Sequence, residues 1–134
     1  MIRQQFFVEH YWKVIVWWNA DYDFFDVIYR DLKAEGCSDH GIKNLYEMMS
    51  SGKAKAVTFS NLLTHHSVLI FNYHTSIKDY LDSVVHEAEH IKQAMLEVYQ
   101  VEDKGEPPAY TVGYLVGRMW EVFRDFVCIT CKHT

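Results

Sequence analysis

The sequence predicts an α+β domain, in which a small, mostly antiparallel sheet of about three strands is covered by about four helices. Two observations predict this class. Runs of aromatic and β-branched residues indicate strands, and four other segments repeat apolar residues every three or four positions, as amphipathic helices do. A third observation, the absence of internal repeats and of a Ser/Gly linker, predicts that residues 1–134 form a single domain.

The first half of the chain begins with a strand and continues with two helices. Residues 11–18, Y-W-K-V-I-V-W-W, are dense in aromatic and β-branched residues, which favours a strand buried on at least one face. Residues 24–35 carry apolar side chains at helical spacing, and Gly36 ends this helix as a left-handed cap. A second short helix covers residues 41–49, with Gly52 behind it.

A hairpin and the longest helix of the chain follow. After Lys55 the chain alternates in A-V-T-F-S, residues 56–60, and residues 66–73 form a second apolar run, so the two segments are expected to pair as neighbouring strands. Thr75 or Ser76 is expected to cap the long helix, because apolar residues recur at three- and four-residue intervals from this point onwards.

The last helix is expected to begin near Pro107, a residue allowed in the first turn, and to continue to Phe126. It contains Gly113 and Gly117 in a G-x-x-x-G pattern. Away from a membrane this pattern predicts close packing against another helix, and the expected neighbour is the long helix before it.

Composition excludes several classes of function. With 13 basic and 18 acidic residues the net charge is −5, and no basic stripe could neutralise a row of phosphates, so nucleic acid is not expected as a partner. No segment is apolar enough for a signal sequence or a membrane span, and three cysteines without framework spacing fit a reducing compartment. A cytoplasmic location is therefore expected.

The long helix carries the motif H-E-A-E-H at positions 86–90. His86 and His90 are four residues apart and share one face of a helix, which suits two imidazole ligands of one tetrahedral Zn²⁺. Glu87 lies beside this face and could take a proton from a metal-bound water. This is the H-E-x-x-H pattern of zincin metallopeptidases; the alternative is three polar residues that share a helix by coincidence.

A catalytic zinc needs a third protein ligand and an open coordination position. Glu106 is the first candidate because a helix packed antiparallel to the long helix could bring it back to the metal; its alternative role is an acid in the first turn of a helix. Tyr110, one turn further on, could donate a hydrogen bond to a developing oxyanion or simply pack between helices. The other candidate ligands are Glu102, Asp103, His74, His65 and His66.

The motif H-E-A-E-H followed by G-E-P-P-A-Y-T-V-G-Y-L-V-G resembles the pattern of small zincin-like proteins encoded by phages and mobile elements of gut bacteria. The resemblance covers residues 84–117, about a quarter of the chain. It implies a glutamate-type zincin in which His86, His90 and Glu106 bind zinc and Glu87 is the base. The sequence departs from the pattern at Glu89, a charged residue between the ligands, and at the Pro-Pro pair after Glu106.

The resemblance itself gives no substrate, but a peptidase of the zincin type is expected to act on a peptide or protein. In zincins an edge strand of the sheet pairs with an extended peptide, and residues 66–73 are expected to fill that role here. If the chain is encoded by a phage, its location is the host cytoplasm or the virion.

Two further groups of residues have competing interpretations. Cys128 and Cys131 form C-I-T-C at the end of a helix, where the dipole does not favour a thiolate, so buried or frayed thiols are favoured over a structural zinc that would include His133 and Cys37. The clustered aromatic residues follow strand and helix spacing, which favours a place in the core over a binding platform for bases or sugars. They are Tyr11, Trp12, Trp17, Trp18, Phe24 and Phe25.

The sequence therefore favours a zinc-dependent metallohydrolase, a peptidase acting through a metal-activated water. The alternative from another class is a non-catalytic structural or host-interaction protein of a phage or mobile element that keeps the same scaffold. A small oligomeric binding module that displays aromatic side chains is a further alternative, and the oligomeric state itself is not determined by the sequence.

Overall fold

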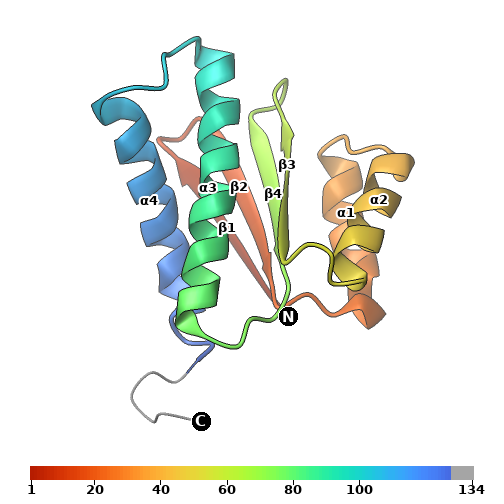
Figure 1. Ribbon diagram of the computed structural model, residues 1–134. Helices are drawn as coiled ribbons and strands as arrows, with labels where there is room; N and C mark the ends of the chain where they lie inside the picture. Colours follow the sequence, from red (N-terminus) through yellow and green to blue (C-terminus); the bar gives the residue numbers. More distant parts are fainter. Residues whose placement is uncertain (128–134) are drawn as a thin grey trace.

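The computed structural model describes residues 1–127, and it places a four-stranded sheet between two pairs of helices (Figure 1). The strand order is β1-β2-β4-β3. In chain order the elements are β1 (Ile2–Val8), β2 (Trp12–Trp18), the short 3-10 helix η1 (Tyr22–Phe24), α1 (Phe25–Ala34), α2 (Asp39–Ser50), β3 (Ala56–Asn61), β4 (His66–Phe71), α3 (Ile77–Tyr99) and α4 (Glu106–Phe123).

The α+β class with four helices is confirmed, but the expected sheet of about three mostly antiparallel strands is wrong. The sheet has four strands and is mixed, because β2 and β4 are parallel while β1 and β3 are antiparallel to their neighbours. The parallel pair arises because the chain leaves β2 through α1 and α2 and forms β3 before it returns beside β2 as β4. Strand β1 was not predicted, because only Phe6 and Val8 of its seven residues are buried and its apolar pattern is weak.

One face of the sheet packs against α3 and α4. Trp18 lies at the centre of this core, where its ring stacks on Phe71 at a centroid distance of 4.5 Å and meets the edge of Tyr80 at 6.3 Å. The expectation that the clustered aromatic residues belong to the core is confirmed for Trp12, Trp17 and Trp18, which are buried. It is wrong for Tyr11 and Phe24, which are 71% and 60% exposed. The apolar residues of the helices here are Tyr80, Val84, Ala88, Ile91, Leu115, Met119 and Phe123.

The other face of the sheet packs against α1 and α2, where Ile28 and Leu32 cover Ile15 and Ile70. Helix α1 ends as the sequence predicted. Gly36 adopts a left-handed conformation with φ +90°, and a Cβ at this position would lie 2.8 Å from the Asn61 side chain. Glycine is therefore required both by the backbone turn and by the close approach of β3.

Helix α3 begins at the predicted cap, because the side chain of Ser76 accepts a hydrogen bond from the backbone N–H of Asp79. It packs against α4, as expected, but the expected role of the glycines is wrong. A Cβ added to Gly113 or to Gly117 would have no atom within 4 Å, so both glycines face away from neighbouring elements. The larger residue Leu115 makes the buried contact instead.

In the part of the chain that the structure describes, no helix is both long and apolar enough to span a membrane. Cys37 is a free, buried thiol, and burial raises its pKa above the usual value. The predicted roles of Cys128, Cys131 and His133 concern residues outside the described range.

Candidate metal centre and its groove

The two histidines of H-E-A-E-H lie on the same side of α3, as their spacing predicted. His86 Nε2 and His90 Nε2 are 3.3 Å apart, and both side chains are accessible to solvent. Zinc binds imidazole nitrogen at about 2.0–2.1 Å, so two nitrogens on one tetrahedral zinc are separated by about 3.4 Å. The pair therefore has the separation that a shared Zn²⁺ requires. The same distance also allows one neutral imidazole to donate a hydrogen bond to the other.

Glu87 lies beneath the histidines and is only 4% exposed. Its Oε1 accepts a hydrogen bond of 2.9 Å from the hydroxyl of Thr58 on β3, and its Oε2 lies 3.9 Å from His86 Nε2. One carboxylate oxygen is therefore fixed by the sheet while the other faces the histidine pair. Among the described residues, His86, Glu87 and His90 form the single group of three or more His, Cys, Asp or Glu side chains whose possible ligand atoms all lie within 4.8 Å of one another.

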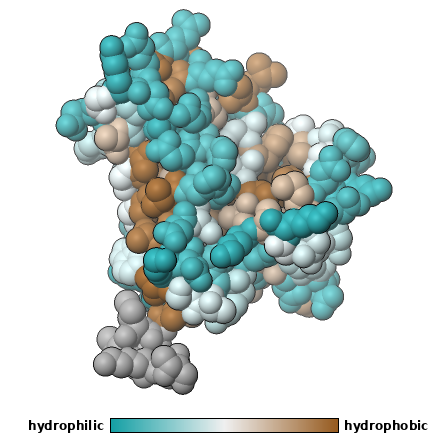
Figure 2. Space-filling model, viewed as in Figure 1, coloured by the Kyte–Doolittle hydropathy of each residue, from teal (hydrophilic) through white to brown (hydrophobic). Residues whose placement is uncertain are grey.

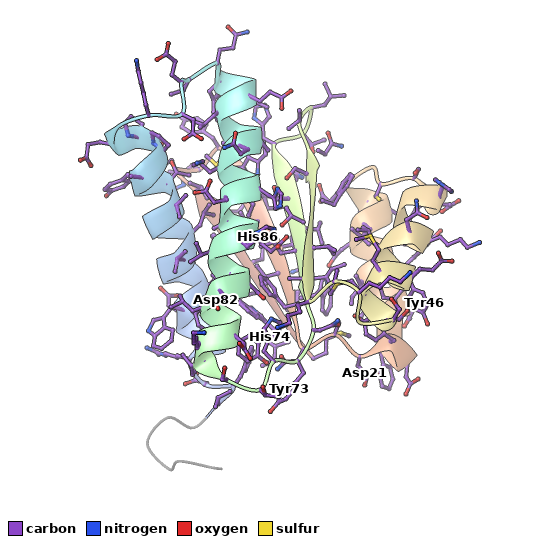
Figure 3. All side chains as sticks on the ribbon, in the orientation of Figure 1. Asp21, Tyr46, Tyr73, His74, Asp82 and His86 are labelled. Atoms are coloured by element: carbon purple, nitrogen blue, oxygen red, sulfur yellow. The ribbon has the colours of Figure 1, made fainter. Side chains whose placement is uncertain are left out.

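These three residues form one wall of a groove with a volume of about 470 Å³. Leu45 and Met48 of α2 form the opposite wall, and strand β3 runs between the two walls. Figure 2 shows this hollow between the hydrophilic outer side of α3 and the α1–α2 pair, with more apolar side chains in it. Figure 3 labels His86 on α3, on the side of the β3–β4 hairpin. We call this hollow the β3 groove.

Strand β3, not the expected segment 66–73, is the edge strand beside the motif, because β4 is enclosed between β2 and β3. The backbone N–H of Asn72 donates to the carbonyl of Lys55, which fixes Ala56 and Phe71 as a pair without mutual hydrogen bonds. Because such pairs alternate along an antiparallel ladder, the backbone groups of Ala56, Thr58 and Ser60 point away from β4 and into the groove. An extended chain could bind to them.

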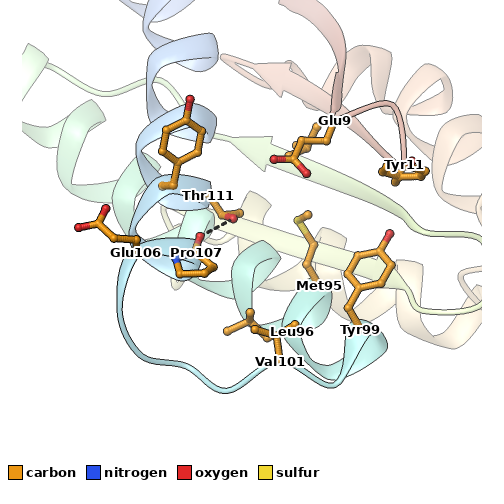
Figure 4. A pocket seen from close by; sticks show the side chains of 11 residues that line it. Glu9, Tyr11, Met95, Leu96, Tyr99, Val101, Glu106, Pro107 and Thr111 are labelled. Carbon is orange, nitrogen blue, oxygen red and sulfur yellow. Dashed lines mark hydrogen bonds between the residues drawn. The ribbon is translucent and has the colours of Figure 1, made fainter.

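The structure does not bring Glu106 to the histidines. Glu106 starts α4 and, with Tyr110, lines a different cavity of about 360 Å³, near the C-terminal end of α3 and the turn between β1 and β2 (Figure 4). Tyr11 and Tyr99 complete this cavity, which we call the tyrosine cavity. Burial, and the proximity of Tyr11 and Glu9, raise the pKa of Tyr99 above its usual value.

Glu89, the charged residue between the two histidines, points to a different part of the molecule. Its carboxylate binds the ammonium of Lys92 at 2.6 Å, and Lys92 also binds Asp103 at 3.0 Å, so Glu89 belongs to a network that holds the loop between α3 and α4. These partners raise the pKa of Lys92, and the hydrogen bonds from Lys92 and Gln93 lower the pKa of Asp103.

The other candidate ligands are also occupied elsewhere. His65 stacks on Trp12 at 5.4 Å, and His66 forms a short contact with the buried carboxylate of Glu35. Glu102 pairs with Lys104 at 2.8 Å. His74 bonds to the backbone of the loop before α3 and to a serine of α3.

Sequence reasoning missed the residues that β3 contributes to the site. The sequence predicted Thr58 only as one residue of the alternating segment A-V-T-F-S. This segment does not indicate which strand of the hairpin lies at the edge of the sheet. The Thr58 side chain faces α3 because it shares parity with Ala56, which packs against the core on that side.

Comparison of the chain with protein-family models, with curated proteins and with solved structures found no match. The resemblance to the zincin-like proteins of phages and mobile elements stays a prediction that depends on the motifs themselves.

Proposed function

We propose that the protein is a zinc-dependent hydrolase that cleaves peptides bound along β3. The observation that carries this proposal is the 3.3 Å separation of His86 Nε2 and His90 Nε2 beside the buried carboxylate of Glu87. If His86 and His90 were paired only by coincidence, there would be no reason to bury the Glu87 carboxylate between them and the sheet. Burying an ionised carboxylate costs free energy unless a partner compensates it.

In this proposal His86 and His90 would hold zinc, which is one protein ligand fewer than catalytic zinc sites usually have, and solvent would occupy the remaining positions. A bound zinc would lower the pKa of a coordinated water to about 7 and would polarise the carbonyl group to be attacked. Glu87 Oε2, which lies 3.9 Å from His86 Nε2, would accept a proton from that water, while Thr58 keeps the other oxygen of the carboxylate in place. The general base is thus oriented before the substrate arrives.

The substrate we propose is an extended peptide, because the groove offers a row of unpaired backbone groups on β3. A peptide that adds to this edge would place its carbonyl groups beside α3 at the level of the motif, and Leu45 and Met48 would contact its side chains. Glu106 has no part in this arrangement, since it lines the tyrosine cavity.

The test is zinc content and peptide cleavage in matched variants. The wild type is expected to bind about one zinc per chain after dialysis against zinc, and His86→Ala and His90→Ala are expected to lose it. Glu87→Gln is expected to keep zinc but to lose cleavage of an unstructured peptide mixture. His40→Ala, which changes an exposed histidine of α2 bonded to Asn44, is the control. Zinc binding that both histidine variants retain would refute the metal site.

The tyrosine cavity favours a second candidate, a non-catalytic interaction protein that uses the same scaffold. Its lining is largely apolar, from residues such as Met95 and Pro107, and Tyr110 beside it is 71% exposed. Exposed aromatic side chains around an apolar hollow are typical of binding surfaces. If Glu87→Gln leaves the function of the protein unchanged while Tyr110→Ala removes it, this second candidate is correct and the hydrolase proposal is wrong.

A further inference from the structure

His74 and Ser83 form a hydrogen-bonded pair near the N-terminal end of α3, away from the tyrosine cavity. His74, in the segment between β4 and α3, is 4% exposed, and its two ring nitrogens are both engaged. Nδ1 lies 2.6 Å from the backbone carbonyl oxygen of Asn72, and Nε2 lies 2.7 Å from the hydroxyl of Ser83 on α3. Figure 3 labels His74 near the N-terminal half of this helix.

These two contacts determine the tautomer of His74. A carbonyl oxygen can only accept, so Nδ1 carries the hydrogen. In the neutral ring Nε2 is then the acceptor, and the Ser83 hydroxyl donates to it. This is the relation between a serine nucleophile and its general base, with a carbonyl in the place where an acidic side chain orients the base in a catalytic triad.

The base is held in place by its surroundings. The Asn72 side chain donates to the carbonyls of Met49 and Ala54 at 3.0 and 3.2 Å, which anchors the residue whose carbonyl orients His74. The imidazole also stacks on the fully buried ring of Tyr80 at a centroid distance of 4.6 Å. Stacking on an aromatic face stabilises an imidazolium, which is the form that a general base adopts after it takes a proton.

Ser83 itself is half-buried and lines an open, polar cavity of about 360 Å³. Lys55 and Ala56 line the same cavity together with Asp79, Asp82, His86 and Glu87, and the Ala56 backbone N–H points away from β4 as described above. An ammonium group and an unpaired N–H are both donors that stabilise an oxyanion. Because Ala56 also lines the β3 groove, the two cavities adjoin along the same edge strand.

We propose that Ser83 and His74 form a nucleophilic centre that cleaves small carboxylic esters without a metal. Ser83 Oγ forms a bond to the acyl carbon, its proton passes to His74 Nε2, and the bond to the alcohol oxygen breaks as the proton passes on to that oxygen. Water then attacks the acyl-serine with His74 again as the base. The bond to Oγ breaks, the proton returns to Ser83, and the carboxylic acid leaves.

This activity requires no metal, so the use of EDTA separates it from the proposed zinc chemistry even though His86 and Glu87 line both cavities. The full chain is treated with diisopropyl fluorophosphate in the presence of EDTA, and intact mass and peptide mass spectra locate the adduct. One adduct per chain, on Ser83, is expected. Ser83→Ala is expected to abolish it, while Ser50→Ala, a control serine on α2, is expected to react at the wild-type rate.

His74→Gln tests the base directly. With folding verified by circular dichroism, this variant is expected to react at least about 100-fold more slowly, the contribution of general base catalysis. No adduct on the folded wild type, or an adduct that persists in Ser83→Ala, would overturn the proposal and leave the hydrogen bond a structural one. A folded His74→Gln variant that reacts as fast as the wild type would also overturn it.

Discussion

The hydrogen bond between Thr58 and Glu87 is expected to stabilise the fold and the site together. Valine has the shape of threonine but no hydroxyl, so Thr58→Val removes the 2.9 Å bond to Glu87 Oε1 with little change in packing. Glu87 is 4% exposed, so water cannot readily replace the lost donor. Hydrogen bonds to charged groups contribute about 1.5–3 kcal/mol, and we expect Thr58→Val to lower the free energy of unfolding by this amount.

The assay is urea unfolding of four proteins: the wild type, Thr58→Val, Glu87→Gln and the double variant. In the Glu87→Gln background the bond is between neutral groups, so Thr58→Val is expected to cost only about 0.5–1.5 kcal/mol, leaving a coupling energy of about 1–2 kcal/mol. Thr75→Val, at an exposed threonine, is the control and is expected to stay within about 0.5 kcal/mol of the wild type. A coupling energy below about 0.3 kcal/mol would refute the argument that β3 positions the carboxylate.

Three other predictions concern Asp103, the two glycines of α4 and Glu106. Hydrogen bonding lowers the pKa of Asp103 in the folded state. The contribution of Asp103 to stability is therefore present above the unfolded pKa of about 3.9 and is lost as pH falls through the folded pKa. Asp103→Asn weakens the interaction with Lys92, so this variant should melt at a lower temperature than the wild type at pH 7 and at the same temperature in strong acid. Gly113→Ala and Gly117→Ala should each raise the free energy of unfolding by about 0.5–1 kcal/mol, since the new methyl group meets no atom, and a loss of stability in urea would contradict this. Glu106→Gln should leave zinc affinity unchanged within about twofold by calorimetry, whereas a tenfold loss would mean that α4 rearranges to supply a ligand.

The helices and the hairpin could be predicted from the sequence because each depends on local patterns. The spacing of apolar residues, the Ser76 cap and Gly36 determine where α1 and α3 lie whatever surrounds them. The sheet could not be predicted in the same way. Its order depends on which strands pair across long sequence separations, and Ile2–Val8 has a weak pattern since it is an edge strand whose outer face carries polar residues.

The candidate site could likewise be predicted only where it depends on local contacts. His86, Glu87 and His90 come together through the geometry of one helix turn, so the motif alone predicts their proximity. Glu106 was expected at the metal because an antiparallel helix returns toward its partner, but α4 begins beside the last turn of α3, several turns beyond the histidines.

The contribution of β3 follows from neither motif nor periodicity. Thr58 reaches Glu87 because β3 is the edge strand that packs against α3, and the sequence does not show that the crossover through α1 and α2 leaves β3 outermost. The same edge joins the β3 groove to the cavity of Ser83. A single topological feature, the edge position of β3, therefore places a substrate-sized groove beside two chemically distinct sets of side chains, and the zinc and fluorophosphate experiments decide separately which set is reactive.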